Sequence, residues 1–206
     1  MRATDAYSGL RELGRPLLST GEAAAAWRVP LPTAARRLRT LLDSGLIRRV
    51  RRGLWALDSD LDPFAVGPYL TAPHPAYVSL WSALARHGMI EQVPRSISLA
   101  SLDRARRIPT AFGVYEVHQL VPELFRGYRE EAPGVYLAGA EKALFDLVYV
   151  RSAAGNIPHL PELTIAPDFD RQLLEQWTGQ IGSTRLATIV DRRLREILAA
   201  AEVEVL

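Results

Sequence analysis

The chain has 206 residues, with 25 basic and 23 acidic side chains and a net charge of +2, so its total charge favours no particular class of partner. Because the sequence holds no cysteine, disulfides and thiolate metal sites are excluded. No apolar run reaches the roughly eighteen residues of a membrane helix, and the N-terminus lacks the apolar stretch of a signal peptide. We therefore expect a cytoplasmic protein, with a length that allows one large domain or two small ones.

The N-terminal part of the sequence predicts two helices. Residues 3–13 carry apolar side chains three positions apart and are followed by a glycine, which is typical of a helix end. Ser19 and Glu22 match a capping box, in which the serine side chain accepts from a backbone N–H three residues on and the glutamate reaches back to the serine N–H. We expect a second helix over residues 22–29, with Trp27 as a core anchor.

The stretch that follows predicts a third helix from Thr33 and then a β-hairpin. Four small or apolar residues of the helix share one face at the spacing of a buried stripe. These residues are Ala34, Leu38, Leu41 and Leu42. Gly45 suits the left-handed position just after a helix end. Two β-prone runs, 46–50 and 54–57, then flank a turn that contains a glycine.

The face of this third helix opposite the stripe is polar, and the hairpin is basic. The side chains that we expect to contact DNA are Thr33, Arg36, Arg37, Arg39 (on a flank) and Thr40 on the helix, and Arg48, Arg49, Arg51 and Arg52 on the hairpin. This layout is typical of a winged helix-turn-helix, whose helix enters the major groove while the hairpin contacts the phosphate backbone. The alternative is an arginine-rich surface that is merely solvated.

Charge is distributed unevenly along the chain. Residues 1–57 hold eleven arginines and four acidic side chains, for a net charge of +7, whereas residues 58–206 have a net charge of −5. A basic segment of this kind is the electrostatic footprint of polyanion binding. We therefore predict a winged helix-turn-helix domain over residues 1–58, an acidic linker that ends at residue 63, and a second domain over residues 64–206.

The second domain mixes predicted helices and strands, so we expect the α+β class. We predict helices over residues 64–70, 76–87, 139–150, 168–177 and 183–200, strands over residues 97–100, 112–120 and 134–138, and an irregular stretch over residues 156–167. The helix at 139–150 has the clearest one-sided apolar stripe. Its members are Ala140, Ala143, Leu144, Leu147 and Val148, and Phe145 widens it.

Few residue patterns indicate catalysis or metal binding. The histidines of the chain are His74, His87, His118 and His159. They lack the paired spacing of a metal site, and no glycine-rich phosphate loop is present. Glu141, Lys142 and Asp146 are similar to part of a nuclease metal site, but they open a helix, where Glu141 favours the helix dipole. We therefore expect neither enzymatic activity nor a cofactor or bound metal.

Two motifs of the second domain resemble the AbiEi family of antitoxins, which belong to bacterial abortive-infection toxin–antitoxin pairs. The first motif is YVSLWSALARHGM, with the matching residues Ser79, Ser82, Ala83, Leu84, His87 and Gly88. The second is GVYLAGAEKALFDLVYV, with the matching residues Glu141, Lys142, Ala143, Leu144, Asp146 and Leu147. The stretch RRIPTAFGVYEVHQL lies between them. The order of winged helix, first motif, strand-rich middle and second motif is similar to that of the family.

The resemblance implies a repressor that binds the double-stranded operator of its own operon and a larger domain that counteracts a nucleotidyltransferase-like toxin, with no membrane partner. Such a protein is expected to be a monomer in solution or a dimer on DNA. For the first motif we prefer structural roles, with Trp81 and Leu84 in the core, His87 at the helix end and Gly88 in the turn. Two alternatives stay open, a one-component repressor with a ligand-sensing C-terminal domain and a DNA-targeted nuclease.

Overall fold

The computed structural model describes residues 3–58, 60–157 and 163–203. It confirms the α+β class and divides the chain into two compact units. The first unit comprises Met1–Val66 with Pro109–Gly113, and the second comprises Gly67–Ile108 with Val114–Leu206. The stretch predicted as a linker falls in the first unit, and Ser59 within it lies outside the described residues.

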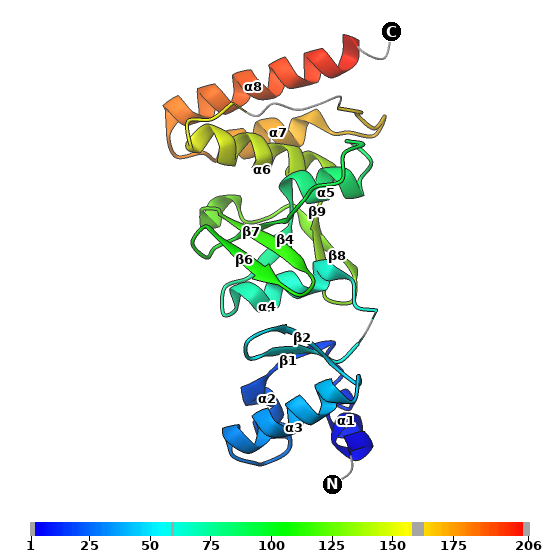
Figure 1. The fold of residues 1–206 in the computed structure, drawn as a ribbon. Coiled ribbons are helices and arrows are strands. Elements are labelled where there is room, and N and C mark those ends of the chain that lie inside the picture. Colours follow the sequence, from blue (N-terminus) through cyan, green and yellow to red (C-terminus); the bar gives the residue numbers. More distant parts are fainter. Residues whose placement is uncertain (1–2, 59, 158–162, 204–206) are drawn as a thin grey trace. The chain divides into compact units, whose positions relative to one another are not determined.

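The first unit contains three α-helices and a small antiparallel sheet (Figure 1). Its elements are α1 (Ala3–Arg11), β1 (Leu17–Ser19), α2 (Thr20–Ala26), α3 (Leu31–Asp43), β2 (Arg48–Arg51), β3 (Leu54–Ala56) and the 3-10 turn η1 (Pro63–Val66). The strands are ordered β1-β3-β2, so β3 pairs on both edges. The capping box of α2 is confirmed, because the Glu22 N–H donates to Ser19 Oγ over 3.1 Å and the Ser19 N–H donates to Glu22 Oε2 over 2.7 Å.

The helices of the first unit pack on one another through their apolar faces. Their shared core includes Leu10 of α1, Leu38 and Leu41 of α3, and Leu18 and Trp55 of the sheet. The predicted stripe of α3 is therefore confirmed. The helix begins two residues earlier than predicted, at Leu31, because a proline in the first turn costs no intrahelical hydrogen bond. Trp27 is half-buried against this core, and its indole N–H donates to the Ala6 carbonyl over 3.2 Å.

The second unit contains a six-stranded mixed sheet with helices packed against it (Figure 1). The strands are β4 (Ala76–Val78), β5 (Ile97–Ser101), β6 (Arg106–Thr110), β7 (Gly113–Gln119), β8 (Tyr128–Ala132) and β9 (Val135–Ala138), in the order β6-β7-β5-β4-β9-β8. The helices are α4 (Gly67–Thr71), α5 (Leu80–Arg86), α6 (Ala140–Ala153), α7 (Arg171–Thr178) and α8 (Thr184–Val203), with a 3-10 turn η2 (Pro122–Leu124). Helix α6 contacts α5, α7 and α8.

The predicted helix over residues 76–87 is wrong in its first part. Residues 76–78 form the central strand β4, which pairs with β5 on one side and β9 on the other, and only α5 is helical. Tyr77 and Val78 have high strand propensity, and Ser79 is the extended residue that precedes α5. Strands β1, β6 and β8 were not predicted, because their charged or short sequences show no clean alternation of apolar and polar residues.

The one-sided stripe predicted for α6 is also incomplete. Eight of its residues are buried, and Lys142 and Asp146 are among them with exposures of 0%. The helix is buried on most of its circumference because α5, α7, α8 and β9 all contact it. In the predicted irregular stretch 156–167, the described residues form no helix or strand, whereas residues 158–162, which include His159, lie outside the described part. Among the described helices, none is long and apolar enough to cross a membrane.

Candidate nucleic-acid interface

The exposed face of α3 presents two arginines and a threonine. Arg36, Arg39 and Thr40 are all exposed, and the Thr40 hydroxyl donates to the Arg36 carbonyl over 3.3 Å. Arg39, which was expected on a flank, thus belongs to the outward face. This face follows directly from the burial of the apolar stripe on the other side of the same helix.

Two of the predicted contact residues of α3 lie at its margin instead. Thr33 and Arg37 are half-buried. The Arg37 guanidinium lies 5.7 Å from the centroid of the Trp27 ring, a distance at which a cation is attracted to the face of an aromatic ring. A helical wheel of α3 alone places Arg37 on the exposed face, because the wheel does not include Trp27 at the C-terminal end of α2. The structure therefore leaves Arg36, Arg39 and Thr40 as the outward set.

The β2–β3 hairpin keeps its arginines exposed through an irregular register. Arg49 pairs with Trp55 and Arg51 pairs with Leu54, so Val50 is an extra residue of the kind found in a β-bulge. The Val50 side chain is buried, whereas both of its neighbours are exposed. Arg52 is exposed in the turn, where Gly53 takes a positive φ of 83°.

Arg48 differs from the other hairpin arginines. It is exposed on β2, but its guanidinium lies 4.4 Å from the centroid of the Phe112 ring, which belongs to the segment Pro109–Gly113 of the same unit. A cation–π contact of this kind competes with a phosphate for the same group. We therefore regard Arg48 as a weaker candidate than Arg49, Arg51 and Arg52.

Five exposed arginines of α3 and of the hairpin have no carboxylate partner in the described part of the chain. Among the described residues, no acidic side chain forms an ion pair with Arg36, Arg39, Arg49, Arg51 or Arg52. Other arginines of the unit do pair, since Arg11 lies 3.9 Å from Asp58 and Arg15 lies 2.8 Å from Glu22. Unpaired positive charge of the unit therefore lies on α3 and on the hairpin, and such charge favours an anionic polymer as partner.

One further exposed basic residue of the first unit was not among the predicted contact residues. Arg28 is exposed in the turn between α2 and α3 and has a positive φ of 50°, which is uncommon for a residue with a side chain. The Val29 N–H donates to the Ala24 carbonyl over 3.0 Å and closes this turn. The only sequence signal for it was a basic residue two positions before Pro30, and this is too weak to identify a site.

Residues of both motifs meet in the interior of the second unit. Asp146 accepts from the Ser79 hydroxyl over 2.7 Å and from the Tyr77 hydroxyl over 2.9 Å, and it forms an ion pair with Lys142. Burial lowers the pKa of Lys142, and the attraction of Asp146 opposes that shift. The pKa of the Tyr77 hydroxyl is raised well above its usual value. Burial is the main cause, and the adjacent Asp146 carboxylate adds to it.

The fold separates the three charged neighbours that are similar to part of a nuclease site. Lys142 and Asp146 are fully buried, whereas Glu141 is half-buried and accepts the Asp170 N–H over 3.0 Å. In the described part of the chain, no three histidine, aspartate or glutamate side chains gather to hold a metal ion. The three residues therefore do not share one surface site.

The structural roles expected for the first motif are confirmed in part. His87 caps the C-terminal end of α5, its Nε2 lies 2.7 Å from the Ala138 carbonyl, and Gly88 takes a positive φ of 69°. Leu84 is buried, as predicted. Trp81 is only half-buried and is therefore not a full core residue.

Comparison with known proteins does not assign the chain to a family, since no family model and no curated protein matches it.

Proposed function

We propose that the first unit is a winged helix-turn-helix and that the protein is a DNA-binding repressor. The observation that carries this proposal is the set of five exposed arginines on the outward face of α3 and on the β2–β3 hairpin of the same unit, none of which has an acidic partner among the described residues. A helix of 13 residues with polar side chains on one face is long enough to lie in a major groove.

In this mechanism the two parts of the surface have different tasks. Arg36 and Arg39 offer forked donors to the O6 and N7 acceptors of guanine, the commonest specific contact in the major groove. Arg49, Arg51 and Arg52 bind phosphates, which fixes the register of the protein on the duplex without reading its sequence. Repression then follows from occupation of a promoter.

The second part of the proposal is that the protein is the antitoxin of a toxin–antitoxin pair and represses its own operon. Support comes from the resemblance of the two motifs to the AbiEi family and from the net charge of −5 over residues 58–206, which disfavours a second DNA contact and suits a protein partner. The proposed partner is a nucleotidyltransferase-like toxin.

The proposal is tested on the full chain with two sets of substitutions and a matched control. Arg36→Ala/Arg39→Ala is expected to abolish preference for the promoter of its own operon over random DNA, and Arg49→Ala/Arg51→Ala/Arg52→Ala to weaken binding to both. Arg11→Ala removes an exposed arginine of α1, outside this surface, and is expected to change neither. Unchanged promoter binding in both variants overturns the winged-helix assignment.

The antitoxin role is tested separately. The gene beside this one is expressed with the full chain, and growth is scored for the wild type and for the hairpin variant. If the neighbouring product is toxic and both forms restore growth, the antitoxin proposal is supported and antitoxicity does not depend on the hairpin arginines. If the neighbouring product is not toxic, or the wild type does not restore growth, the antitoxin proposal fails while DNA binding stands.

A further inference from the structure

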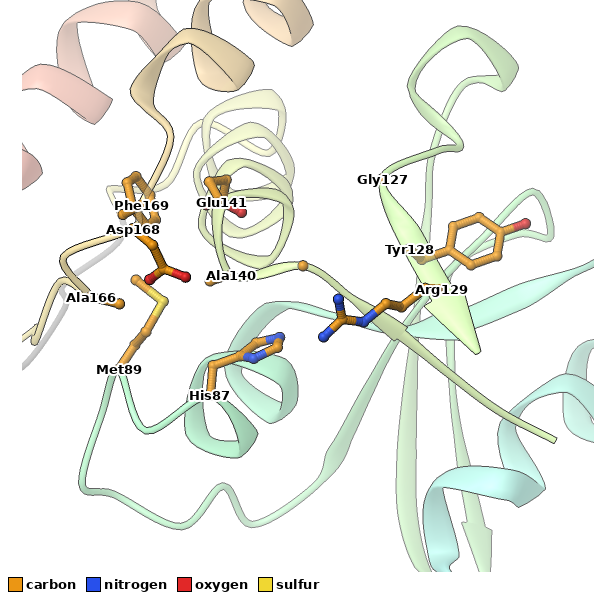
Figure 2. A pocket seen from close by; sticks show the side chains of 11 residues that line it. His87, Met89, Gly127, Tyr128, Arg129, Ala140, Glu141, Ala166, Asp168 and Phe169 are labelled. Carbon is orange, nitrogen blue, oxygen red and sulfur yellow. The ribbon is translucent and has the colours of Figure 1, made fainter. Parts of the chain in front are cut away.

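The second unit contains a cavity of about 490 Å³ beside the first turn of α6, within the range of small-molecule sites. Its lining comes from four separate segments: the end of α5, the start of β8, the start of α6 and the chain before α7 (Figure 2). The side chains that matter for recognition are His87, Met89, Arg129, Glu141, Asp168 and Phe169.

One wall of the cavity is backbone held in a fixed position. Gly127 has a positive φ of 75°, and its carbonyl accepts the Gly139 N–H over 3.0 Å, which ties the start of β8 to the start of α6. A Cβ at position 127 would lie 3.0 Å from the Lys142 stem and from the Trp177 ring. The buried core behind α6 therefore positions this wall.

Charges of opposite sign line the cavity without neutralising each other. Arg129 and Asp168 extend into it from opposite sides (Figure 2), and both are exposed. Among the described residues, neither has an ion-pair partner. Glu141 adds a second carboxylate on the side of α6, where the Asp170 N–H holds one of its oxygens. The charged lining thus has a positive pole, formed by Arg129, and a negative pole, formed by Asp168 and Glu141.

Groups between the poles complete the site. The Nε2 of His87 is engaged by the Ala138 carbonyl, so Nδ1 is the ring nitrogen left to a ligand. Met89 and Phe169 contribute apolar surface. A molecule with charges of both signs and a short aliphatic part matches this arrangement better than a simple anion, which the two carboxylates repel.

We propose that this cavity binds a small zwitterion of the amino-acid class, with its carboxylate on Arg129 and its ammonium group on Asp168 and Glu141. Because the three charged side chains sum to −1, a ligand of net charge +1 is preferred. The site is a binding site for a metabolite and stands independently of the proposed contact with DNA.

L-Lysine is the probe, because it pairs an α-zwitterion with a second ammonium group, and its binding to the full chain is measured by calorimetry. L-Glutamate keeps the α-zwitterion but has an acidic side chain, hexanoate has only the anion and pentylamine only the cation. We expect saturable binding of lysine, at least about tenfold weaker binding of glutamate, and no saturation with either single-charge probe.

Two variants locate the binding. Arg129→Ala and Asp168→Asn each remove one charge-assisted hydrogen bond to the ligand and are expected to weaken lysine binding by about tenfold or more. Both side chains are exposed, so folding is expected to persist, and circular dichroism checks it. Arg107→Ala, an exposed arginine of the edge strand β6, is the matched control. Failure of lysine to saturate, equal binding of hexanoate, or unchanged affinity in both variants overturns the proposal.

Discussion

The Ser79 hydroxyl donates to the Asp146 carboxylate over 2.7 Å inside the second unit, and this bond joins two residues that lie 67 positions apart in the chain, one in each motif. Asp146 also accepts from Tyr77 and pairs with Lys142, whose ammonium group lies 5.1–5.9 Å from the centroids of three aromatic rings. Among the described residues, no buried side-chain nitrogen or oxygen lacks a hydrogen-bond partner. The motif residues thus form one satisfied polar core.

This network makes Lys142 costly to remove. Lys142→Met leaves a buried carboxylate without its counter-charge, and we expect a loss of about 3–5 kcal/mol in the free energy of unfolding by urea. Replacing both charges, in Lys142→Met/Asp146→Asn, is expected to cost less than the single change, because no unpaired charge is buried and the amide oxygen can still accept from Tyr77 and Ser79. A single variant whose free energy of unfolding lies within about 1 kcal/mol of the wild type contradicts this expectation.

Gly155 and Gly127 have nearly equal φ, so replacing each with alanine distinguishes the cost of a left-handed backbone from the cost of a steric clash. Gly155→Ala at φ 73° meets no atom within 4 Å, so only the left-handed backbone, about 1–2 kcal/mol, is expected to destabilise it. Gly127→Ala at φ 75° also meets Lys142 and Trp177 at 3.0 Å and is expected to cost clearly more. Thermal unfolding measures the loss of stability in both variants. Equal losses show that Lys142 and Trp177 move aside at little cost.

We expect the salt dependence of the proposed DNA binding to distinguish the role of the hairpin from that of α3. Replacing any one of Arg49, Arg51 and Arg52 with alanine should reduce the slope of log K against log salt by about 0.9, because one phosphate is then no longer neutralised. Arg36→Ala should instead reduce sequence preference by about 1–3 kcal/mol. Replacing its target guanine with 7-deazaguanine should have the same effect in the wild type, and a promoter insensitive to that base excludes the proposed pairing.

If the protein is the proposed repressor, we expect it to recognise a single promoter with more than one copy. One α3 reads only a few base pairs, so we expect two half-sites about one helical turn, or a multiple of it, apart. Footprinting at saturation detects them. Protection of one isolated half-site contradicts the expectation.

The capping box of α2 gives the first unit a defined response to acid. The Ser19 N–H holds the pKa of Glu22 below its ordinary value of 4.5, a shift that burial opposes and Arg15 assists. Because the folded-state pKa is the lower one, Glu22 stabilises the fold above about pH 4.5, and this contribution is lost as the pH falls through the folded-state pKa. Glu22→Gln should lower Tm at pH 7, and the difference should vanish at the acid end. A difference independent of pH assigns the effect to the hydrogen bond alone.

Short-range patterns in the sequence were sufficient for the features that depend on near neighbours. The stripe of α3, the capping box at Ser19 and the hairpin around Gly53 each involve residues within a few positions, whose geometry is set by the helical period, by backbone hydrogen bonds and by positive φ. The arginine clusters were visible for the same reason, since charge is a property of composition.

Features that depend on distant residues were decided only by the tertiary structure. The ring of Trp27 draws Arg37 to the margin of the basic surface, and the pairing of β4 with β5 and β9 converts the start of a predicted helix into a strand. Lys142 and Asp146 are tolerated in the core because Tyr77 and Ser79, on another element, complete their hydrogen bonds. Such contacts have no local period in the sequence, because their free energy depends on which surfaces the folded chain brings together and removes from water.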